Sequence, residues 1–127
     1  MFAECLTAKL SELARLRIWD GVVARAWGGD LAALTAIELE PGAHVPEHAH
    51  PNEQAGVLLR GVVTFRIGSE TKELRAGSTW AIPGDAPHEV TAGPEGAFLV
   101  ELFAPPRADW AGFERLDPGP ISGLPLR

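Results

Sequence analysis

The close spacing of turn residues along the chain is the feature that most constrains the fold. From Arg17 onward, short apolar stretches end every few residues at glycine, proline or aspartate, which leaves almost no room for a helix of ordinary length. The predicted strands cover residues 17–26, 31–40, 56–60, 62–67, 71–75, 78–82, 87–92 and 96–103. Many short strands at regular intervals are typical of an antiparallel sandwich or barrel. The sequence therefore predicts an all-β fold.

The two ends of the chain differ from this pattern. Leu6, Leu10 and Leu13 follow one another at nearly helical spacing, which indicates a short amphipathic helix of a turn or two within residues 1–14. Residues 108–127 are rich in proline and glycine, and the last ten have too little patterned apolar content for a strand or a helix. This C-terminal tail is predicted to be loop-like.

Length, charge and cysteine content exclude several classes of protein. A chain of 127 residues leaves room for one core, so we expect a single domain over residues 1–127. The formal net charge is −6 and no run of Lys or Arg could follow a phosphate backbone, so nucleic acid is not an expected partner. No stretch reaches the ~18 apolar residues of a membrane span, and charged residues interrupt the apolar N-terminus before a signal-peptide core forms. We therefore expect a cytoplasmic protein with no membrane partner. The single cysteine, Cys5, cannot form an internal disulfide.

Histidine spacing indicates a metal site. His48 and His50 are separated by one residue, and a strand places such residues on the same face, which in a barrel is the interior. Gln54 shares this parity and can supply a neutral oxygen ligand, although an irregular loop would let Glu53 take that place instead. His88 follows a turn and begins a strand that could lie beside the first. A simpler interpretation is that the histidines only pack and form hydrogen bonds.

Two segments resemble the two motifs of the cupin family. They read Gly42-x5-His48-x-His50-x3-Gln54-x6-Gly61 and Gly77-x5-Pro83-x4-His88. The resemblance covers about residues 17–107 and implies an RmlC-like cupin, a double-stranded β-helix or jelly-roll barrel. It also implies that His48, His50, Gln54 and His88 bind one divalent transition metal. Nickel, zinc, iron, manganese or copper would each suit these ligands.

The segment departs from the cupin pattern at two positions. Gln54 stands where the family usually has an acidic ligand, and Asp85 stands where the second motif has a glycine. With four neutral ligands, a bound ion keeps its full charge and is a stronger Lewis acid. His44 shares the strand parity of His48, but its place four residues earlier favours a position at the surface or behind a ligand over direct ligation.

The last predicted strand adds a second group of polar residues. Alternation places Glu101 and Phe103 on one face, and Arg107 follows a rigid Pro-Pro pair that would present its guanidinium to a carboxylate. This segment resembles small cupins of pectin and alginate degradation that open 4,5-unsaturated uronates, whose strand carries Asp-x-Phe-x3-Arg. The resemblance implies that Glu101 and Arg107 are catalytic and that Phe103 and Arg107 bind substrate. Phe103 as a core residue and Arg107 in a surface ion pair are the simpler interpretations.

Three functions follow from these groups. The first is metal-dependent ring opening or tautomerisation of an unsaturated uronate or a similar small anionic sugar acid, by a lyase or isomerase. The others are a metal-dependent dioxygenase, which needs an apolar pocket, and a cupin that binds metal or ligand without catalysis. Outward apolar residues, among them Val57, Leu59 and Trp27, predict a homodimer. The four tryptophans have no spacing typical of nucleic-acid binding and are predicted to be core or subunit contacts.

Overall fold

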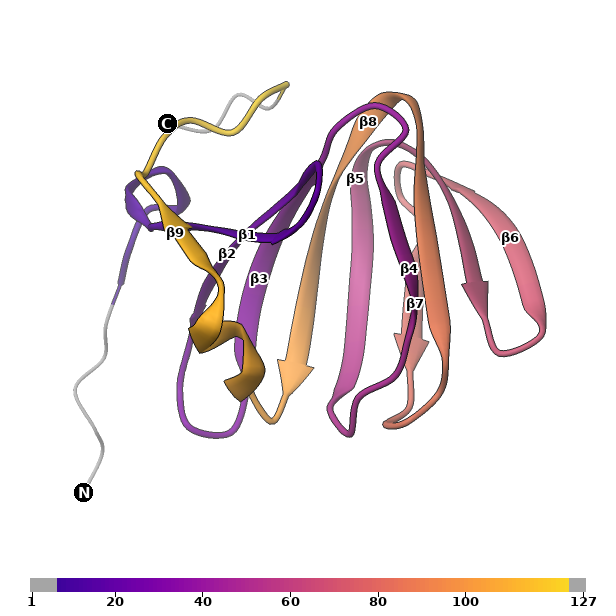
Figure 1. The fold of residues 1–127 in the computed structure, drawn as a ribbon, viewed down its shortest axis with the longest axis horizontal. Coiled ribbons are helices and arrows are strands. Elements are labelled where there is room, and N and C mark those ends of the chain that lie inside the picture. Colours follow the sequence, from indigo (N-terminus) through magenta and orange to yellow (C-terminus); the bar gives the residue numbers. More distant parts are fainter. Residues whose placement is uncertain (1–6, 124–127) are drawn as a thin grey trace.

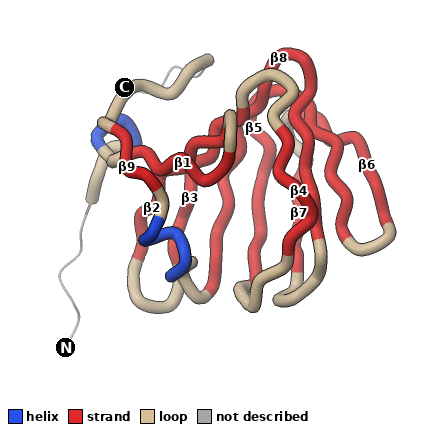
Figure 2. The backbone as a smooth tube through the Cα atoms, in the orientation of Figure 1, coloured by secondary structure: helices blue, strands red, loops and turns tan. Residues whose placement is uncertain are grey.

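Nine antiparallel strands form a jelly-roll barrel in the computed structural model, which describes residues 7–123 (Figure 1). The strands are β1 (Arg15–Trp19), β2 (Val22–Gly28), β3 (Ala33–Leu39), β4 (His44–His48), β5 (Glu53–Ile67), β6 (Glu70–Arg75), β7 (Thr79–Ile82), β8 (His88–Ala104) and β9 (Glu114–Leu116). Two short 3-10 helices, η1 (Leu10–Glu12) and η2 (Ala108–Gly112), lie on the side of the barrel formed by β1, β2 and β9 (Figure 2). The prediction of an all-β fold is confirmed.

The strands run in the order β6-β5-β8-β3-β2-β1-β9, and β4 and β7 pair with β8 and β5. β5 and β8 pair with each other along most of their lengths, and each also serves two different neighbours. The first part of β5 pairs with β7 and its second part with β6. The first part of β8 pairs with β4 and its second part with β3. The two long strands therefore join the two walls of the barrel.

Bends within β5 and β8 explain why each was predicted as two strands. Gly61 and Gly96 lie at the bends, with φ of 88° and 74°. That conformation favours glycine, and a side chain at Gly61 would meet the carbonyl oxygen of Gly96. The sequence shows turn residues here, but the chain bends and continues because the two strands remain paired with each other.

Three other sequence predictions are corrected. The predicted strand 17–26 is two strands, because Gly21, with φ of 73°, turns the chain between β1 and β2. Of the helix predicted within residues 1–14, the described part from residue 7 onward contains only the short η1, and Leu6 lies outside the described residues. The tail 108–127 contains η2 and also β9, which forms a strand because it pairs with β1.

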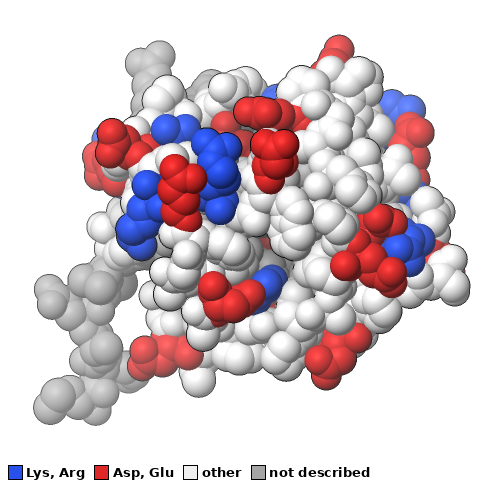
Figure 3. Space-filling model, in the orientation of Figure 1, with Lys and Arg blue, Asp and Glu red and all other residues white. Residues whose placement is uncertain are grey.

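The barrel encloses one large apolar core to which nearly every strand contributes. Its fully buried members include Val22, Leu58, Val63 and Ile82. Phe65 packs on Trp80 with ring centroids 5.2 Å apart. Within the described residues, no helix is both long and apolar enough to cross a membrane. On the face drawn in Figure 3, Lys and Arg side chains lie beside Asp and Glu side chains and form no continuous basic surface.

A buried arginine holds both ends of the described chain against the outer surface of the sheet. Arg25, on β2, is 1% exposed. Its guanidinium donates to the carbonyls of Leu10 (3.1 Å), Gly119 (2.5 Å) and Pro120 (3.1 Å), and to the carboxylate of Glu38 (3.2 Å). The tail then places Ile121 over Ala36 and Phe98, which form a second, smaller apolar cluster.

The R25M variant is expected to lower the free energy of unfolding by about 3 kcal/mol, because it removes the donor that pairs a carboxylate and three carbonyls at a buried site. Urea unfolding followed by tryptophan fluorescence measures this loss. The control is R17M, since Arg17 forms an exposed ion pair with Glu114 and such pairs contribute about 0–1 kcal/mol. Equal stability of the two variants would contradict the role given to Arg25.

Candidate metal centre

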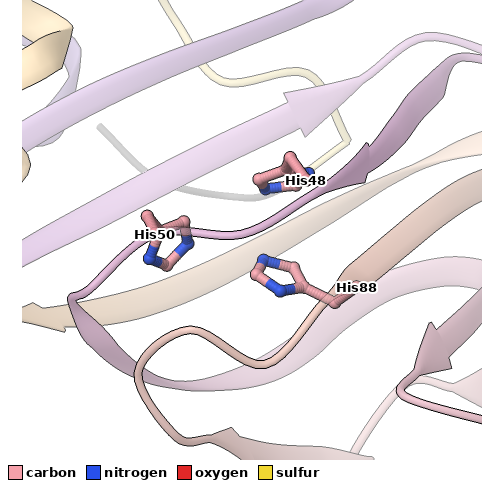
Figure 4. A group of neighbouring side chains, drawn as sticks. All are labelled: His48, His50 and His88. Atoms are coloured by element: carbon pink, nitrogen blue, oxygen red, sulfur yellow. The ribbon is translucent and has the colours of Figure 1, made fainter.

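Three histidines from two neighbouring strands converge inside the barrel. His48 ends β4, His50 lies in the loop that follows, and His88 begins β8 opposite His48. One ring nitrogen from each histidine lies within 4.8 Å of the other two. Figure 4 shows the three rings turned toward a common space. The pairing of β4 with β8 is therefore what brings distant parts of the sequence into one site.

Backbone carbonyls determine which nitrogen of each histidine is free. Every Nδ1 of the group lies within hydrogen-bond distance of a carbonyl, namely Pro46 for His48 (2.8 Å), Asn52 for His50 (3.0 Å) and Ala86 for His88 (2.8 Å). Because a carbonyl can only accept, each Nδ1 carries a hydrogen, so in the neutral ring it is Nε2 that keeps its lone pair. The Nε2 atoms of His50 and His88 are buried and have no hydrogen-bond partner among residues 7–123.

Burial also keeps these imidazoles uncharged. It lowers the pKa of His88 to about 4, and it lowers the pKa of His50 as well, because the cavity wall does not solvate a cation. Both rings are therefore neutral at pH 7. Neutral imidazole is the form that binds a metal ion.

Gln54 supplies a fourth candidate metal ligand to the same cavity, beside the three histidines. Its side chain is 3% exposed, and its Oε1 is buried without a hydrogen-bond partner in the described part of the chain. Its Nε2 donates to Oε2 of Glu101 at 2.5 Å. Glu53, the alternative ligand, is exposed on the opposite face of β5 and does not line the cavity. The alternation of β5 thus favours Gln54.

The fourth histidine lies elsewhere. The His44 side chain is 47% exposed, with Nδ1 2.7 Å from Oγ1 of Thr91 and Nε2 3.1 Å from Oε2 of Glu89. Both ring nitrogens are therefore occupied at the surface, which is one of the two places favoured for it by the sequence.

The histidines and Gln54 open on a cavity of about 460 Å³. Most of its lining is apolar, and five of the side chains are aromatic: Trp19, Phe65, Phe103, Trp110 and Phe113. The Trp19 ring lies 5.9 Å from that of His48, and the Phe103 ring lies 5.7 Å from that of His50. Phe103 is buried in the core and also lines the cavity, so both interpretations of this residue apply.

Glu101 lies in this cavity wall, as the alternation of the last strand predicts. It is 7% exposed, and burial raises the pKa of its carboxyl group. Its Oε2 accepts hydrogen bonds from Gln54 and from Nε1 of Trp80, the latter at 2.9 Å. Sequence reasoning assigned Trp80 to the core or a subunit contact and missed this hydrogen bond.

Arg107 lines the cavity but already has a partner. Its Nε and Nη2 donate to the carboxylate of Asp109 at 2.9 and 2.8 Å, which lowers the pKa of Asp109. Its guanidinium carbon lies 5.2 Å from the ring centre of Phe103 and 5.4 Å from that of Trp110. Sequence reasoning missed Asp109, although an acidic residue two positions after the arginine was a visible signal.

The family model described as Cupin domain (Cupin_2) matches residues 36–103, which is more than half of the chain. The chain belongs to the cupin family. The sequence resemblance and the predicted jelly-roll barrel are both confirmed. A cupin commonly binds a metal, and His48, His50 and His88 could hold one in this chain.

Individual relatives add a sequence match and two matches of fold. The chain is 40% identical over 73 residues to the dimethylsulfoniopropionate lyase DddW of Ruegeria pomeroyi, a match that covers 56% of this chain and 47% of DddW. The cupin thus matches only about half the length of that relative. It also resembles an RmlC-like cupin from Shewanella frigidimarina NCIMB 400, with a TM-score of 0.72, 23% identity and coverage of 77% of this chain and 88% of that one. KdgF from Halomonas sp. gives a TM-score of 0.70 and 20% identity over 75% of this chain and 88% of that chain.

The donor set of this cupin fits a divalent transition ion. Three imidazole nitrogens, which are borderline ligands, and one amide oxygen, which is a hard ligand, together suit zinc, nickel, iron, copper or manganese to different degrees. Two of the nitrogens and the oxygen are buried and unpartnered among the described residues, and such atoms are costly unless a ligand, water or ion completes them.

The H88A variant is expected to weaken binding of a divalent ion on the order of 100-fold or more, because it removes one ligand outright, whereas changes behind the ligands typically cost 10–100-fold. Elemental analysis and titration with Zn²⁺ measure the stoichiometry and the affinity. The matched control is H44A, which removes a histidine whose ring nitrogens already have surface partners. Loss of binding in H44A, or its retention in H88A, would contradict the site.

Proposed function

We propose that this cupin is a metal-dependent enzyme that takes a proton from a small carboxylate, with β-elimination as the best supported reaction. The observation that carries the proposal is the convergence of three imidazoles, the Gln54 amide oxygen and the buried Glu101 carboxylate on one largely apolar cavity. A cavity with convergent polar groups and a carboxyl group of raised pKa is typical of an active site.

His48, His50, Gln54 and His88 would hold the metal ion. When bound, the ion supplies a Lewis acid that stabilises negative charge on a substrate oxygen. The carbonyls behind the histidines keep each Nε2 directed to one point and prevent the rings from turning.

Glu101 is the proposed general base. Its Oε2 is engaged by Gln54 and Trp80, and its Oε1 accepts no hydrogen bond from the described residues. Burial raises the pKa of this carboxyl group, which makes the carboxylate a stronger base. In an elimination, Glu101 takes the proton from the carbon next to the substrate carboxylate. The electron pair of that C–H bond forms the new double bond. The bond between the next carbon and the leaving group breaks, and the leaving group keeps the electron pair of that bond.

The cavity and the relative together favour a small substrate with an apolar or onium leaving group. Arg107 has five N–H donors and uses two on Asp109, so three that have no partner among residues 7–123 could bind a substrate carboxylate. The aromatic rings of Trp19 and Phe113 line the cavity, and such rings attract the methyl groups of a positively charged onium centre. Dimethylsulfoniopropionate, the compound in the name of the lyase DddW, has both a carboxylate and an onium leaving group that carries methyl groups.

Ring opening of an unsaturated uronate is the second candidate. One observation favours it, because Phe103 and Arg107, which match the uronate-opening pattern in the sequence, line the cavity together with Glu101, which stands where that pattern has an aspartate. The apolar lining offers few partners for sugar hydroxyl groups, which places this reaction second.

The E101Q variant of the metal-loaded enzyme is expected to lose at least about 10²-fold in kcat, because an amide cannot accept the proton. Release of dimethyl sulfide from dimethylsulfoniopropionate and loss of absorbance of unsaturated galacturonate measure the two reactions. The control is E53Q, since Glu53 is exposed on the opposite face of β5. The proposal would be contradicted if the metal-loaded wild type turned over neither substrate, or if E101Q kept full activity.

We also propose that the enzyme is a homodimer. On the outer face of the barrel, Trp27 lies opposite Leu34, Leu34 opposite Leu102, and Leu102 opposite Ala55, so that one apolar row crosses four strands. Trp27, Leu34 and Leu102 are among the exposed large apolar residues. Of the residues that predicted a dimer, Leu59 and Trp27 are exposed and Val57 is partly buried. A second copy placing the same row against this one would cover it.

Sedimentation is expected to give the dimer mass for the wild type and the monomer mass for L102E, because that change puts a charge in the middle of the row. The control T71E adds the same charge to the exposed strand β6 and keeps the dimer mass. A wild-type mass equal to that of one chain would contradict the dimer.

A further inference from the structure

Gly56 occupies a special place on β5, between two functional side chains. Its register partners are Trp80 on β7 and Glu101 on β8, so it separates the two within the sheet. A Cβ atom at Gly56 would lie 2.5–2.7 Å from three atoms of the Trp80 indole, including Nε1. The indole therefore lies directly over the glycine backbone, and the absence of a side chain at position 56 is what gives it that space.

This placement lets Trp80 reach across β5 to Glu101. Nε1 of Trp80 donates to Oε2 of Glu101 at 2.9 Å, and Nε2 of Gln54 donates to the same oxygen. An indole N–H can only donate, and a carboxylate oxygen accepts. Two donors from different strands thus meet at one buried acceptor, which fixes the carboxylate in the cavity wall.

The fixed carboxylate in turn determines how the Gln54 amide is oriented. With Nε2 on Glu101, the amide oxygen Oε1 points away from that carboxylate and stays without a partner among residues 7–123. In the flipped amide, Oε1 would face Oε2 of Glu101, and two acceptors would meet in a buried place. Leaving buried polar groups unpaired costs about 1–3 kcal/mol each, so the flipped form is disfavoured.

We propose that Gly56, Trp80 and Glu101 form a positioning chain that presents Oε1 of Gln54 to the metal ion. The inference rests on the proposed metal site and adds residues that do not themselves touch the ion. It gives Glu101 a second role beside the proposed proton transfer, since Oε2 orients Gln54 and Oε1 accepts no hydrogen bond from the described residues. It also explains why an amide stands where the family usually has an acidic ligand. The carboxylate is supplied by Glu101, which lies behind Gln54 and is hydrogen-bonded to it.

A double-mutant cycle on Zn²⁺ affinity tests the positioning chain with a readout that does not depend on turnover. Q54E removes the N–H that Glu101 accepts and brings two acceptors together, so Zn²⁺ should bind at least about 10-fold more weakly. E101Q alone keeps an oxygen that can accept from both donors, and its loss should be smaller than 10-fold. In the double variant Q54E/E101Q the amide and the carboxylate exchange places, and the affinity should return to the wild-type value or exceed it.

Two further variants address the other members of the chain. W80F removes the indole N–H and G56A displaces the indole, so each should weaken Zn²⁺ binding by about 10-fold without changing a ligand. The control W27F alters a tryptophan on the outer face and should bind Zn²⁺ like the wild type. Thermal unfolding of the metal-free proteins shows that each variant is folded at the temperature of the titration.

The possible outcomes separate the two proposals. If the wild type binds no Zn²⁺, both the metal site and the positioning chain are wrong. If the wild type binds Zn²⁺ and Q54E changes the affinity equally in both backgrounds, only the positioning chain is wrong. Recovery of Zn²⁺ affinity in the double variant, together with weaker Zn²⁺ binding in W80F, would support the proposed positioning chain.

Discussion

The pairing of β5 with β8 is the interaction on which the rest of the structure depends. It places Gln54 opposite Phe103 and Gly56 opposite Glu101 at one end, and Ile67 opposite His88 at the other. Because each strand also serves two other neighbours, the same pairing holds β4 with its histidine at the cavity and β7 with its tryptophan beside Glu101. The glycines at the bends, Gly61 and Gly96, allow this by letting two long strands curve together.

Local periodicity predicted the part of the site that lies on regular strands. Alternation along β5 places Gln54 inside and Glu53 outside, and alternation along β8 places Glu101 and Phe103 inside, as the structure shows. His50 is a different case, because it lies in a loop, where the two-residue period does not apply. Its ring faces the site because the carbonyl of Asn52 accepts from its Nδ1, a contact that strand spacing does not describe.

The residues that sequence reasoning missed act across strands. Nothing near Trp80 in the sequence indicates that its indole lies over Gly56, because the two residues are brought together by the β5–β7 register. The tail strand β9 was also missed, since three residues form a strand only where β1 offers its edge. Similarly, glycines that bend a continuous strand cannot be told from glycines that end one until the pairing of the strand is known.

Charge in the cavity follows from burial and pairing more than from the number of ionisable residues. Within residues 7–123, Arg107 is the one cationic side chain that lines the cavity, and Asp109 already balances it. The imidazoles of His50 and His88 are kept neutral by burial, so the Glu101 carboxylate, when ionised, has no balancing imidazolium near Gln54. A buried carboxylate of that kind is costly without a cation nearby. The same burial that raises the pKa of Glu101 therefore also favours a divalent ion on the far side of the Gln54 amide, and this links the proposed base to the proposed metal site.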